Sequence, residues 1–497
     1  MPIVFNPTSK TGDYKGYFSN TLNQAGNTGL YGSTAANKFL QDAKNGSNSV
    51  DIVILGDSNA GYNNTGWLYA WEKGMVDAGA LPYATSLNPS MHTAATNIYA
   101  GSGIGVTYAT DQAANPAWLG LGTSSGAADV VVSTFWNNVG NEFRTWSSGL
   151  NWAYVATGTG QETTYHTQIG SSSPLDPKAN LKYRVCYLKF PFGAGQFSLS
   201  CYINGGAFLG TQAFSTAGGS YDANIATFDL PADPNRTSSI RFTKYGAFYG
   251  AQYGVTGPVG FLFESVYRQR KGFAVNMLQY YGGRQTGQMA TTFETAGGQA
   301  TIKTYLTELR NRQIAAGGTG RVLVFTNTSI NDAGAVVIDQ YATNANRIVS
   351  VFTKAWIELN YPQSDLAFVI SRTHPTEAGD ANQTIASFLG KNQVSPGSAG
   401  NVTFVDTNEL LPPSFLTTNG FYDAGGTSHL TASGYGAAGN RLVDSLIRVL
   451  LGAVVLTGFS QFDGGVAATS SYPDNVNGQV ASSVVYPNTI NNGTANN

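Results

Sequence analysis

Short apolar runs alternate with helix-like periodicity in two separated parts of the chain. The first run covers residues 50–55 and is followed by Trp67, Leu68, Trp71 and Met75 at helical spacing. The same texture resumes after residue 272 and predicts further strands at 273–278, 322–325, 366–370 and 402–405, with helices at 302–314, 347–359 and 435–451. Continuous apolar runs are typical of strands buried on both faces of a parallel sheet. Five such strands alternating with helices predict an α/β fold with a doubly wound, flavodoxin-like parallel sheet.

A different pattern fills residues 105–265. Apolar and polar positions alternate there with a period of two, and turns rich in Gly, Pro and Asn separate the runs. The clearest runs cover 150–155, 183–190, 196–203, 225–230, 239–244 and 259–267. Regularly spaced short strands predict an antiparallel β-sandwich or jelly roll, inserted into the α/β domain. Its many aromatic residues suit a carbohydrate-binding face, although most aromatics in any sandwich belong to its core.

These patterns divide the chain into four parts. Residues 1–49 are rich in Asn, Gly, Ser and Thr without clear periodicity, and they are expected to form an arm or attachment segment. Residues 50–104 and 266–452 form the α/β domain, and 105–265 the inserted β domain. Residues 453–497 return to Gly, Ser, Asn and Thr and predict an extended or interface-forming tail.

Composition narrows the functional classes. Only 11% of the 497 residues are charged, against roughly 25% in ordinary soluble chains, while 42% are hydrophobic and the net charge is −2. Without a basic block, nucleic-acid binding by phosphate neutralisation is disfavoured. The longest strongly apolar run, near 449–456, is far shorter than the ~20 residues of a membrane span. The N-terminal sequence lacks the basic and apolar regions of a Sec signal, and the weakly charged composition resembles that of extracellular or virion-surface proteins.

The two cysteines support no metal or redox site. Cys186 and Cys201 flank a turn-like stretch at 191–195, and counting from its centre places them opposite one another in a hairpin. A disulfide and ordinary buried packing both remain open, because directly opposed pairs are geometrically demanding.

Candidate chemical groups follow the predicted parallel strands. Ser58 follows the first strand, Gly282 and Gly283 the second, and Asn331 the third. His374 follows the fourth strand, and the loop after the fifth contains Asp423 and His429. Because the carboxyl ends of parallel strands meet at one edge of the sheet, we expect these groups to converge there.

The residues at these strand ends resemble the sequence blocks of the SGNH (GDSL-type) hydrolases. Segment 56–59 reads Gly-Asp-Ser-Asn, with Asn where the family has Leu. Segment 329–332 reads Ser-Ile-Asn-Asp and is similar to the family's Gly-x-Asn-Asp block, with Ser in place of Gly. Segment 428–431, Ser-His-Leu-Thr, precedes Gly434 and a helix, as the final histidine block does. The resemblance covers residues 50–100 and 266–452 in the family's block order.

The resemblance implies a serine esterase that needs no metal or organic cofactor. Ser58 would be the nucleophile, His429 the general base and Asp423 the acid of the triad. The oxyanion hole would be formed by the backbone N–H of Ser58, that of Gly282 or Gly283, and the side chain of Asn331.

Alternatives exist for several of these roles. A serine after a strand can simply cap a helix, and Asn327 is a rival for the role of Asn331. Of the four histidines, His92 and His166 lie in or near the β-rich region, while His374 could approach the site. The family places an aspartate three residues before the histidine, where this chain has Gly426; Asp423 is the nearest acid, and a bend at Gly425 and Gly426 could bring it to the imidazole.

The inserted β-rich region resembles that of SGNH deacetylases on bacteriophage tail spikes. This resemblance implies a virion-associated or extracellular enzyme that removes O-acetyl groups from a surface polysaccharide. Its partners would be a glycan substrate and either further copies of the chain or virion proteins, with neither nucleic acid nor membrane. The alternative is a receptor-binding or structural virion protein that retains the hydrolase fold with weak or lost activity.

Overall fold

The computed structural model describes the α/β part of the chain and most strands of the β-rich part. The described residues are 29–61, 66–85, 88–89, 106–110, 130–132, 154–156, 163–169, 173–188, 196–203, 208–215, 223–238, 240–246, 259–280, 285–294, 296–332, 338–376, 381–394, 401–423, 429–451, 471–473 and 483–485.

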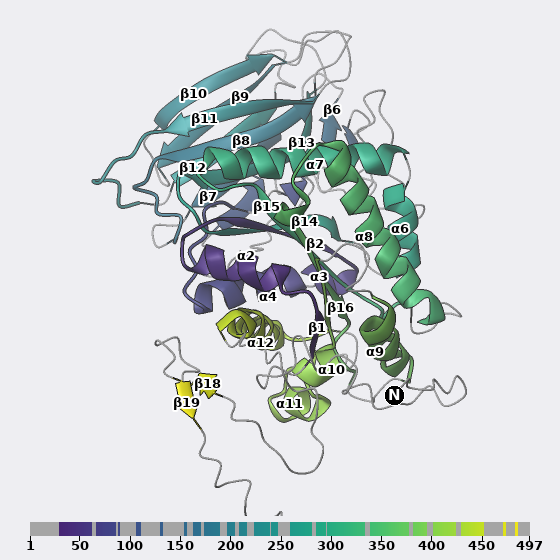
Figure 1. Cartoon of the computed structure of the whole chain (residues 1–497). Helices are drawn as coiled ribbons and strands as arrows, with labels where there is room; N and C mark the ends of the chain where they lie inside the picture. The colour runs from purple at the N-terminus through teal and green to yellow at the C-terminus, as the bar shows by residue number, and fades with distance from the viewer. Residues whose placement is uncertain are drawn as a thin grey trace, which may run out of the picture.

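One six-stranded sheet forms the centre of the α/β part. Its spatial order is β1-β17-β16-β15-β2-β14. The strands are β1 (Leu30–Gly32), β2 (Val50–Gly56), β14 (Phe273–Tyr280), β15 (Arg321–Thr328), β16 (Leu366–Arg372) and β17 (Val402–Val405). The last five are mutually parallel, whereas β1 pairs antiparallel with β17. The chain passes from β2 to β14 on one side and then to β15 on the other side, so the winding direction reverses between β2 and β15 (Figure 1).

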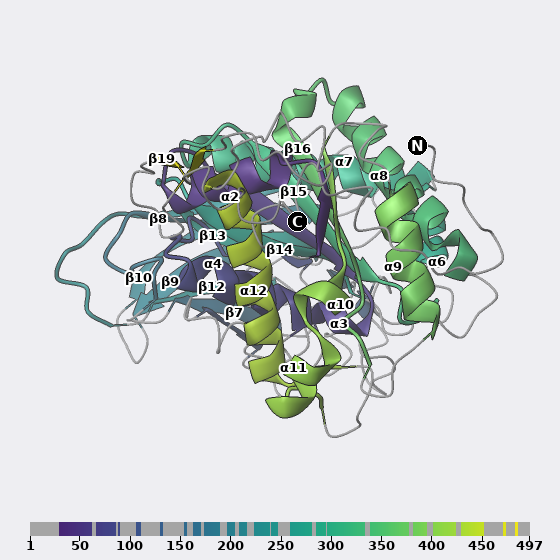
Figure 2. The same cartoon turned by 60° about the horizontal axis from the view of Figure 1, so that its bottom comes forward.

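Helices cover both faces of this sheet (Figures 1 and 2). One layer consists of α2 (Ala35–Lys44), α4 (Gly66–Asp77) and α12 (Ala432–Leu451), and the other of α6 (Thr286–Glu294), α7 (Ala296–Ala315), α8 (Tyr341–Glu358) and α9 (Ala381–Gln393). Shorter helical turns are α3 (Ser58–Gly61), α10 (Thr407–Leu410), α11 (Pro413–Thr418), η3 (Ile338–Gln340) and η4 (Gln363–Asp365). Alternate residues of β2 point into opposite layers: Ile52 and Ile54 belong to the cluster of α2, α4 and α12, and Val53 and Leu55 to the other.

Glycine allows α4 and α12 to pack closely. A Cβ atom on Gly439 would lie 1.8 Å from the carbonyl oxygen of Ala70, and one on Gly74 would lie 2.5 Å from the carbonyl oxygen of Gly439. Neither position therefore accepts a larger side chain without moving the helices apart.

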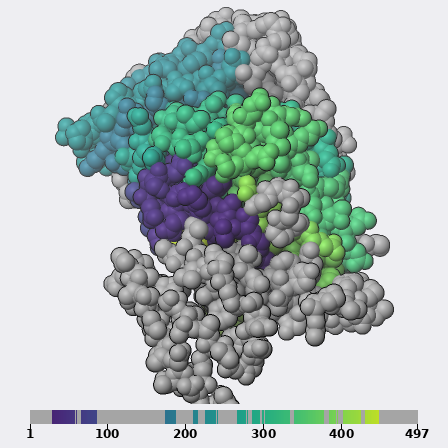
Figure 3. Space-filling view, viewed as in Figure 1, coloured from purple at the N-terminus to yellow at the C-terminus, as the bar shows by residue number. Residues whose placement is uncertain are grey.

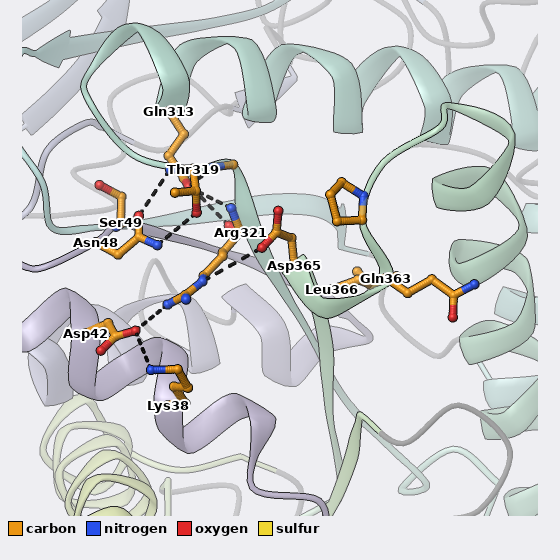
Figure 4. A network of polar contacts seen from close by, with 12 residues as sticks. Lys38, Asp42, Asn48, Ser49, Gln313, Thr319, Arg321, Gln363, Asp365 and Leu366 are labelled. Carbon is orange, nitrogen blue, oxygen red and sulfur yellow. Dashed lines mark hydrogen bonds and ion pairs between the residues drawn. The ribbon is translucent and has the colours of Figure 1, made fainter.

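The segment expected to be an arm contributes to the sheet from Leu30 onward. β1 pairs with β17, and α2 lies in the layer of α4 and α12. Figure 4 shows the polar contacts at this end of the sheet: the Arg321 guanidinium lies 2.5 Å from an Asp42 carboxylate oxygen and 3.9 Å from one of Asp365. These contacts connect α2, β15 and η4. The α/β part thus begins about twenty residues before the expected boundary at residue 50.

Two antiparallel sheets occupy the described part of the segment between α4 and β14. Their orders are β10-β9-β12-β7-β4 and β11-β8-β13-β6-β5, with β3 beside β13. The strands are β3 (Asn88–Pro89), β4 (Val106–Thr110), β5 (Val130–Val132), β6 (Tyr154–Ala156), β7 (Thr163–Ile169), β8 (Leu181–Leu188), β9 (Gln196–Ile203), β10 (Phe208–Ser215), β11 (Ala223–Leu230), β12 (Ile240–Gly246) and β13 (Val259–Arg268). β18 (Ser471–Pro473) and β19 (Ser483–Val485) pair with each other.

Apolar side chains from both antiparallel sheets share one cluster. Ile169 and Ile240 come from one sheet, and Val185 and Ala226 from the other. The Arg184 guanidinium of β8 donates two hydrogen bonds of 2.7 and 2.9 Å to the Glu308 carboxylate of α7. This ion pair connects the strand-rich part to the α/β part. Figure 3 shows the surfaces of these two parts in contact.

The prediction that Cys186 and Cys201 lie opposite one another in a hairpin is wrong. β8 carries Cys186 and β9 carries Cys201, but the two strands belong to different sheets. Both cysteines are buried, and they form no disulfide with each other. Equal spacing from a turn cannot distinguish a hairpin from a connection that crosses from one sheet to the other.

Within the described residues, no helix combines the length and apolar character needed to cross a bilayer.

Candidate active site

The candidate groups gather at the carboxyl end of β2, where the winding direction of the sheet reverses. Gly56 ends β2 and lies opposite Tyr280 of β14 and Asn327 of β15. Ser58 begins α3 two residues later. In open parallel sheets the crevice at such a reversal is the usual position of a ligand site. The Ser58 side chain lies outside the described part of the structure, so its predicted contact with His429 stays a prediction.

Asp57 is the polar centre of the loop that carries Ser58. Its carboxylate accepts hydrogen bonds from the Asn59 backbone N–H (2.8 Å), the Asn59 side-chain amide (3.2 Å) and the Asn331 side-chain amide (2.9 Å). Burial disfavours the charged form and raises the pKa of Asp57 to about 7, although the donors from Asn59 oppose this shift. Asn331 therefore lies beside the residue that directly precedes Ser58.

The backbone of the 329–332 segment explains one departure from the family pattern. Ser329 stands where the family has Gly, and its φ angle is 115°. This backbone region favours glycine. The chain therefore keeps a glycine-like conformation without the glycine.

Asp332 connects this segment to the start of α6. Its carboxylate accepts hydrogen bonds from the Thr286 backbone N–H (3.1 Å) and the Thr286 hydroxyl (2.5 Å). Thr286 closely follows Gly282 and Gly283, which lie outside the described residues, so the glycine contribution to an oxyanion hole stays a prediction. The contacts nonetheless fix the end of β15 against the element that follows those glycines.

Asp423 and His429 face each other across a short antiparallel bridge. The Asp423 backbone N–H donates to the His429 carbonyl oxygen (3.1 Å), and Tyr422 pairs with Leu430. Burial lowers the pKa of His429, and the nearby Asp423 carboxylate partly offsets this shift. Gly425 and Gly426 lie outside the described residues, and Asp423 and His429 on either side of them are neighbours.

Tyr435 connects the histidine hairpin to the serine loop. This residue lies near the start of α12, and its hydroxyl donates to the side-chain oxygen of Asn59 at 2.7 Å. The Tyr435 backbone N–H in turn donates to the Thr431 carbonyl oxygen at 2.9 Å. The serine loop and the histidine hairpin are therefore held at the same edge of the sheet.

The two rival residues have different surroundings. Asn327 is buried, and its amide donates to the Ser371 hydroxyl (2.9 Å) and the Arg372 carbonyl oxygen (2.7 Å), which joins β15 to β16. His374 is fully buried, with its ring 6.3 Å from that of Tyr435. Burial, with a smaller contribution from the positive charge that His429 can carry, lowers the pKa of His374 to about 3. An imidazole that stays neutral at every moderately acidic pH is a poor proton acceptor, which favours His429 as the base.

Sequence reasoning assigned no role to Asp57, Asn59, Thr286 or Tyr435. Asp57 and Asn59 flank Ser58, so the motif itself was the available signal for them. Thr286 and Tyr435 act through tertiary contacts that no local pattern reveals. Among the described residues, no group of three or more His, Cys, Asp or Glu side chains is arranged to hold a metal ion.

Comparison with known proteins shows the fold. No protein-family model matches the sequence, and no curated protein is detectably similar. A solved structure of a peptidoglycan O-acetylesterase matches with a TM-score of 0.50 and 15% identity, covering 84% of this chain and 97% of that one. An acetyl xylan esterase from the rumen bacterium Butyrivibrio proteoclasticus matches with a TM-score of 0.22 and 11% identity, covering 69% of this chain and 98% of that one.

A bacteriophage CBA120 tailspike domain matches with a TM-score of 0.19 and 9% identity, covering 33% of this chain and 19% of that one. The TM-scores of the last two structures are too low to support a conclusion. The chain therefore has a mixed α/β fold with a parallel sheet, and it shares this fold over most of its length with the peptidoglycan O-acetylesterase.

Proposed function

We propose that the protein is an SGNH-type serine esterase that hydrolyses O-acetyl esters on a polysaccharide through an acyl-serine intermediate. One observation carries the proposal: three separate segments meet where the sheet reverses its winding. The Asn331 amide contacts Asp57 beside Ser58, and Tyr435 joins the same loop to the hairpin of Asp423 and His429. A nucleophile, a base and an oxyanion donor at one edge are what acyl transfer requires.

In the proposed reaction, the Ser58 hydroxyl oxygen attacks the ester carbonyl carbon while His429 accepts the hydroxyl proton. As the tetrahedral intermediate collapses, its bond to the sugar oxygen breaks, and this oxygen takes the proton from His429 and leaves as a hydroxyl group. Water, activated by the same imidazole, hydrolyses the acyl-serine and releases the carboxylic acid. The Asp423 carboxylate stabilises the imidazolium that forms in both halves of the reaction.

The Asn331 side-chain amide donates to the Asp57 carboxylate beside Ser58, which places it at the end of β2. In the proposed reaction this amide donates to the oxyanion, together with the backbone N–H of Ser58 and that of Gly282 or Gly283. Each such donor is worth about 3 kcal/mol in the transition state.

The substrate class rests on two weaker supports. The solved structure that shares the fold is, by its name, an O-acetylesterase of a glycan. The two antiparallel sheets between α4 and β14, taken as an inserted β-sandwich in the doubly wound domain, provide a second surface for a carbohydrate chain. A virion or extracellular location, with virion proteins or further copies as partners, is proposed from composition and from the resemblance to tail-spike deacetylases.

A second candidate is an inactive receptor-binding or structural virion protein. The observation that favours it is Gly426 at the position where the family places its acid. The position of Asp423 beside His429 weighs against it, because the chain keeps a carboxylate close to the imidazole.

Acetate release from O-acetylated peptidoglycan, acetylated xylan and acetylated capsular polysaccharide tests the proposal. We expect release from at least one of them and a loss of about 10³-fold or more in Ser58→Ala. Ser350→Ala, at an exposed position on α8, is the matched control and should keep the wild-type rate. Glycan binding that Ser58→Ala leaves intact, without any acetate release by the wild type, would favour the inactive alternative.

A further inference from the structure

Ser329 is held in a backbone conformation that serine rarely adopts. Its φ angle of 115° lies in the region where only glycine is unstrained, and the residue is buried with 1% of its surface exposed. Such a conformation costs free energy and persists only when surrounding contacts impose it. Ser329 lies two residues before Asn331, so the strain is located within the candidate oxyanion segment.

Gln383 imposes this conformation from a different part of the fold. The Ser329 hydroxyl donates to the Gln383 side-chain oxygen (2.7 Å), and the Gln383 side-chain amide donates to the Ser329 carbonyl oxygen (3.1 Å). The Thr373 backbone N–H donates to the same hydroxyl (3.1 Å). Gln383 thus binds both the side chain and the backbone of one residue, which defines its conformation more strongly than a single hydrogen bond would.

The constrained carbonyl group also shapes the segment that contains Asn331. The Ser329 carbonyl oxygen accepts a second hydrogen bond from the Asp332 backbone N–H (3.1 Å), which closes a turn around residues 330 and 331. The Ile330 backbone N–H donates to the Thr373 hydroxyl (3.1 Å). From this turn the Asn331 amide reaches Asp57.

Gln383 itself is firmly anchored. It lies in the first turn of α9 with 2% of its surface exposed. Its backbone carbonyl oxygen accepts a hydrogen bond from the Arg372 guanidinium (3.3 Å), and that guanidinium is paired with the buried Asp406 carboxylate (3.0 Å). These contacts hold the backbone of Gln383 in place, so its side chain can hold Ser329 in a defined position.

We propose that Gln383 is a positioning residue of the active site, which locks Ser329 in its glycine-like conformation and so places the Asn331 amide for the oxyanion. The inference rests on the proposed esterase function. In the family pattern, position 329 is a glycine, which adopts this backbone conformation without support because it has no Cβ. In this chain the hydrogen bonds from Gln383 would stabilise the same conformation for serine.

A double-variant comparison tests this role. In the full-length protein with Ser329 intact, Gln383→Ala should lower kcat by about tenfold with KM changed less than about twofold, because a misplaced donor weakens transition-state binding. In the Ser329→Gly background, where the turn forms without a lock, Gln383→Ala should cost at most about twofold. Ser329→Ala, which keeps the strain and removes the hydroxyl contacts, should lower kcat like Gln383→Ala. Gln393→Ala, exposed at the far end of α9, is the matched control and should have no effect.

Two further measurements make the result decisive. Gln383→Met, which keeps the side-chain length without its hydrogen bonds, replaces Gln383→Ala if the latter does not fold. Labelling of each variant with a fluorophosphonate serine probe reports the state of the nucleophile independently of the choice of ester. Equal losses of kcat with and without the Ser329→Gly substitution, in a protein that hydrolyses esters, would overturn the positioning role alone. A folded wild type that neither hydrolyses any ester nor reacts with the probe would overturn the proposed function and this inference with it.

Discussion

Strand β2 carries a buried aspartate at each end, and the two are held in different ways. Asp51, near the amino end, pairs with the Arg312 guanidinium and accepts hydrogen bonds from the Gln313 amide (2.8 Å) and the Tyr83 hydroxyl (2.7 Å). Asp57, just past the carboxyl end, is held by the amides of Asn59 and Asn331. At the amino end the buried carboxylate is thus paired with a cation, which is the arrangement of a structural ion pair.

The carboxyl end is arranged differently. Burial raises the pKa of Asp57 to about 7, and the amide donors from Asn59 offset only part of this shift. A histidine that burial keeps neutral, His374, lies nearby against the ring of Tyr435. A carboxyl group whose pKa lies near neutrality at one end of a strand and an ion pair at the other are the contrast expected between a reactive site and a structural element. The following experiments test this contrast.

The largest effect on stability should come from the amino end. Arg312→Met leaves the Asp51 carboxylate buried without its cation and should lower the free energy of unfolding by about 3–5 kcal/mol. Lys303→Met, which removes a partly exposed cation from the same helix, should cost about 1 kcal/mol or less. Urea unfolding measures both. Equal losses in the free energy of unfolding for the two variants would mean that the ion pair of Asp51 and Arg312 does not stabilise the fold.

Asn331 and Asn327 should separate activity from stability. Asn331→Ala should lower kcat by about 10²–10³, since it removes a transition-state donor, and should lower the free energy of unfolding by about 1 kcal/mol through the lost hydrogen bond to Asp57. Asn327→Ala should chiefly lower the free energy of unfolding, by about 1–3 kcal/mol, because it removes two buried hydrogen bonds between β15 and β16. Steady-state kinetics and urea unfolding of both variants are the measurements. The reverse pattern would make Asn327 the oxyanion donor.

Asp423→Asn should affect both the rate and its dependence on pH. His429 must be neutral to act as base, so activity rises as the pH increases through its pKa. Since the Asp423 carboxylate raises that pKa, its removal should move the acid limb of the kcat/KM profile to lower pH. It should also reduce kcat, by less than Ser58→Ala does, because the imidazolium loses its counter-charge. If neither the pH of the acid limb nor kcat changes, another group orients the histidine. The proposed roles of Ser58 and His429 would still stand.

The smallest expected effect is a change in how stability depends on pH. The folded state binds a proton at Asp57 between pH 3.8 and about 7, where the unfolded aspartate is ionised, so this group adds stability as the pH falls. The unfolded state binds a proton at His374 between about pH 3 and 6.5, where the buried imidazole is neutral, so this group removes stability as the pH falls. Between pH 4 and 6.5 the two contributions should nearly cancel.

His374→Gln should expose the contribution of Asp57. Relative to wild type, its free energy of unfolding should rise by about 1 kcal/mol for each unit that the pH falls from 6.5 to 4. Asp57→Asn should give a slope of opposite sign. Urea unfolding at several pH values measures these slopes, and parallel curves for wild type and both variants would show that neither group titrates as described.

The parallel strands were predictable because burial on both faces leaves a continuous apolar run, as in residues 50–55. β1 was not, because three residues in a polar segment give no periodicity, and only pairing with β17 makes them a strand. β10 was missed for a related reason, since Thr211, Gln212 and Ala213 are exposed and carry no apolar alternation. Short edge elements take their structure from their neighbours more than from their own sequence.

The positions of the candidate site residues could be predicted from their motifs, while their roles stay predictions. Ser58, Asn331 and His429 were expected beyond the strand ends, and Asp423 was expected near His429, beside which it lies in the structure. The sequence showed Ser329 only as a departure from the motif that it resembles, whereas the structure gives this residue a φ angle of 115°, in the region that favours glycine. Its hydrogen-bond partners are Thr373, just after β16, and Gln383 in α9. Both lie more than forty positions away in the sequence, and only the folded chain brings them to Ser329.

The most direct test of the account is the covalent chemistry of Ser58. The intact protein is treated with a fluorophosphonate at neutral pH, and the mass of the adduct and its position are determined by peptide mass spectrometry. The account predicts one adduct per chain, on Ser58, which Ser58→Ala abolishes, His429→Ala strongly slows and Ser350→Ala leaves unchanged. A folded wild-type protein that forms no adduct, or forms it on another serine, would contradict a serine esterase at the carboxyl end of β2.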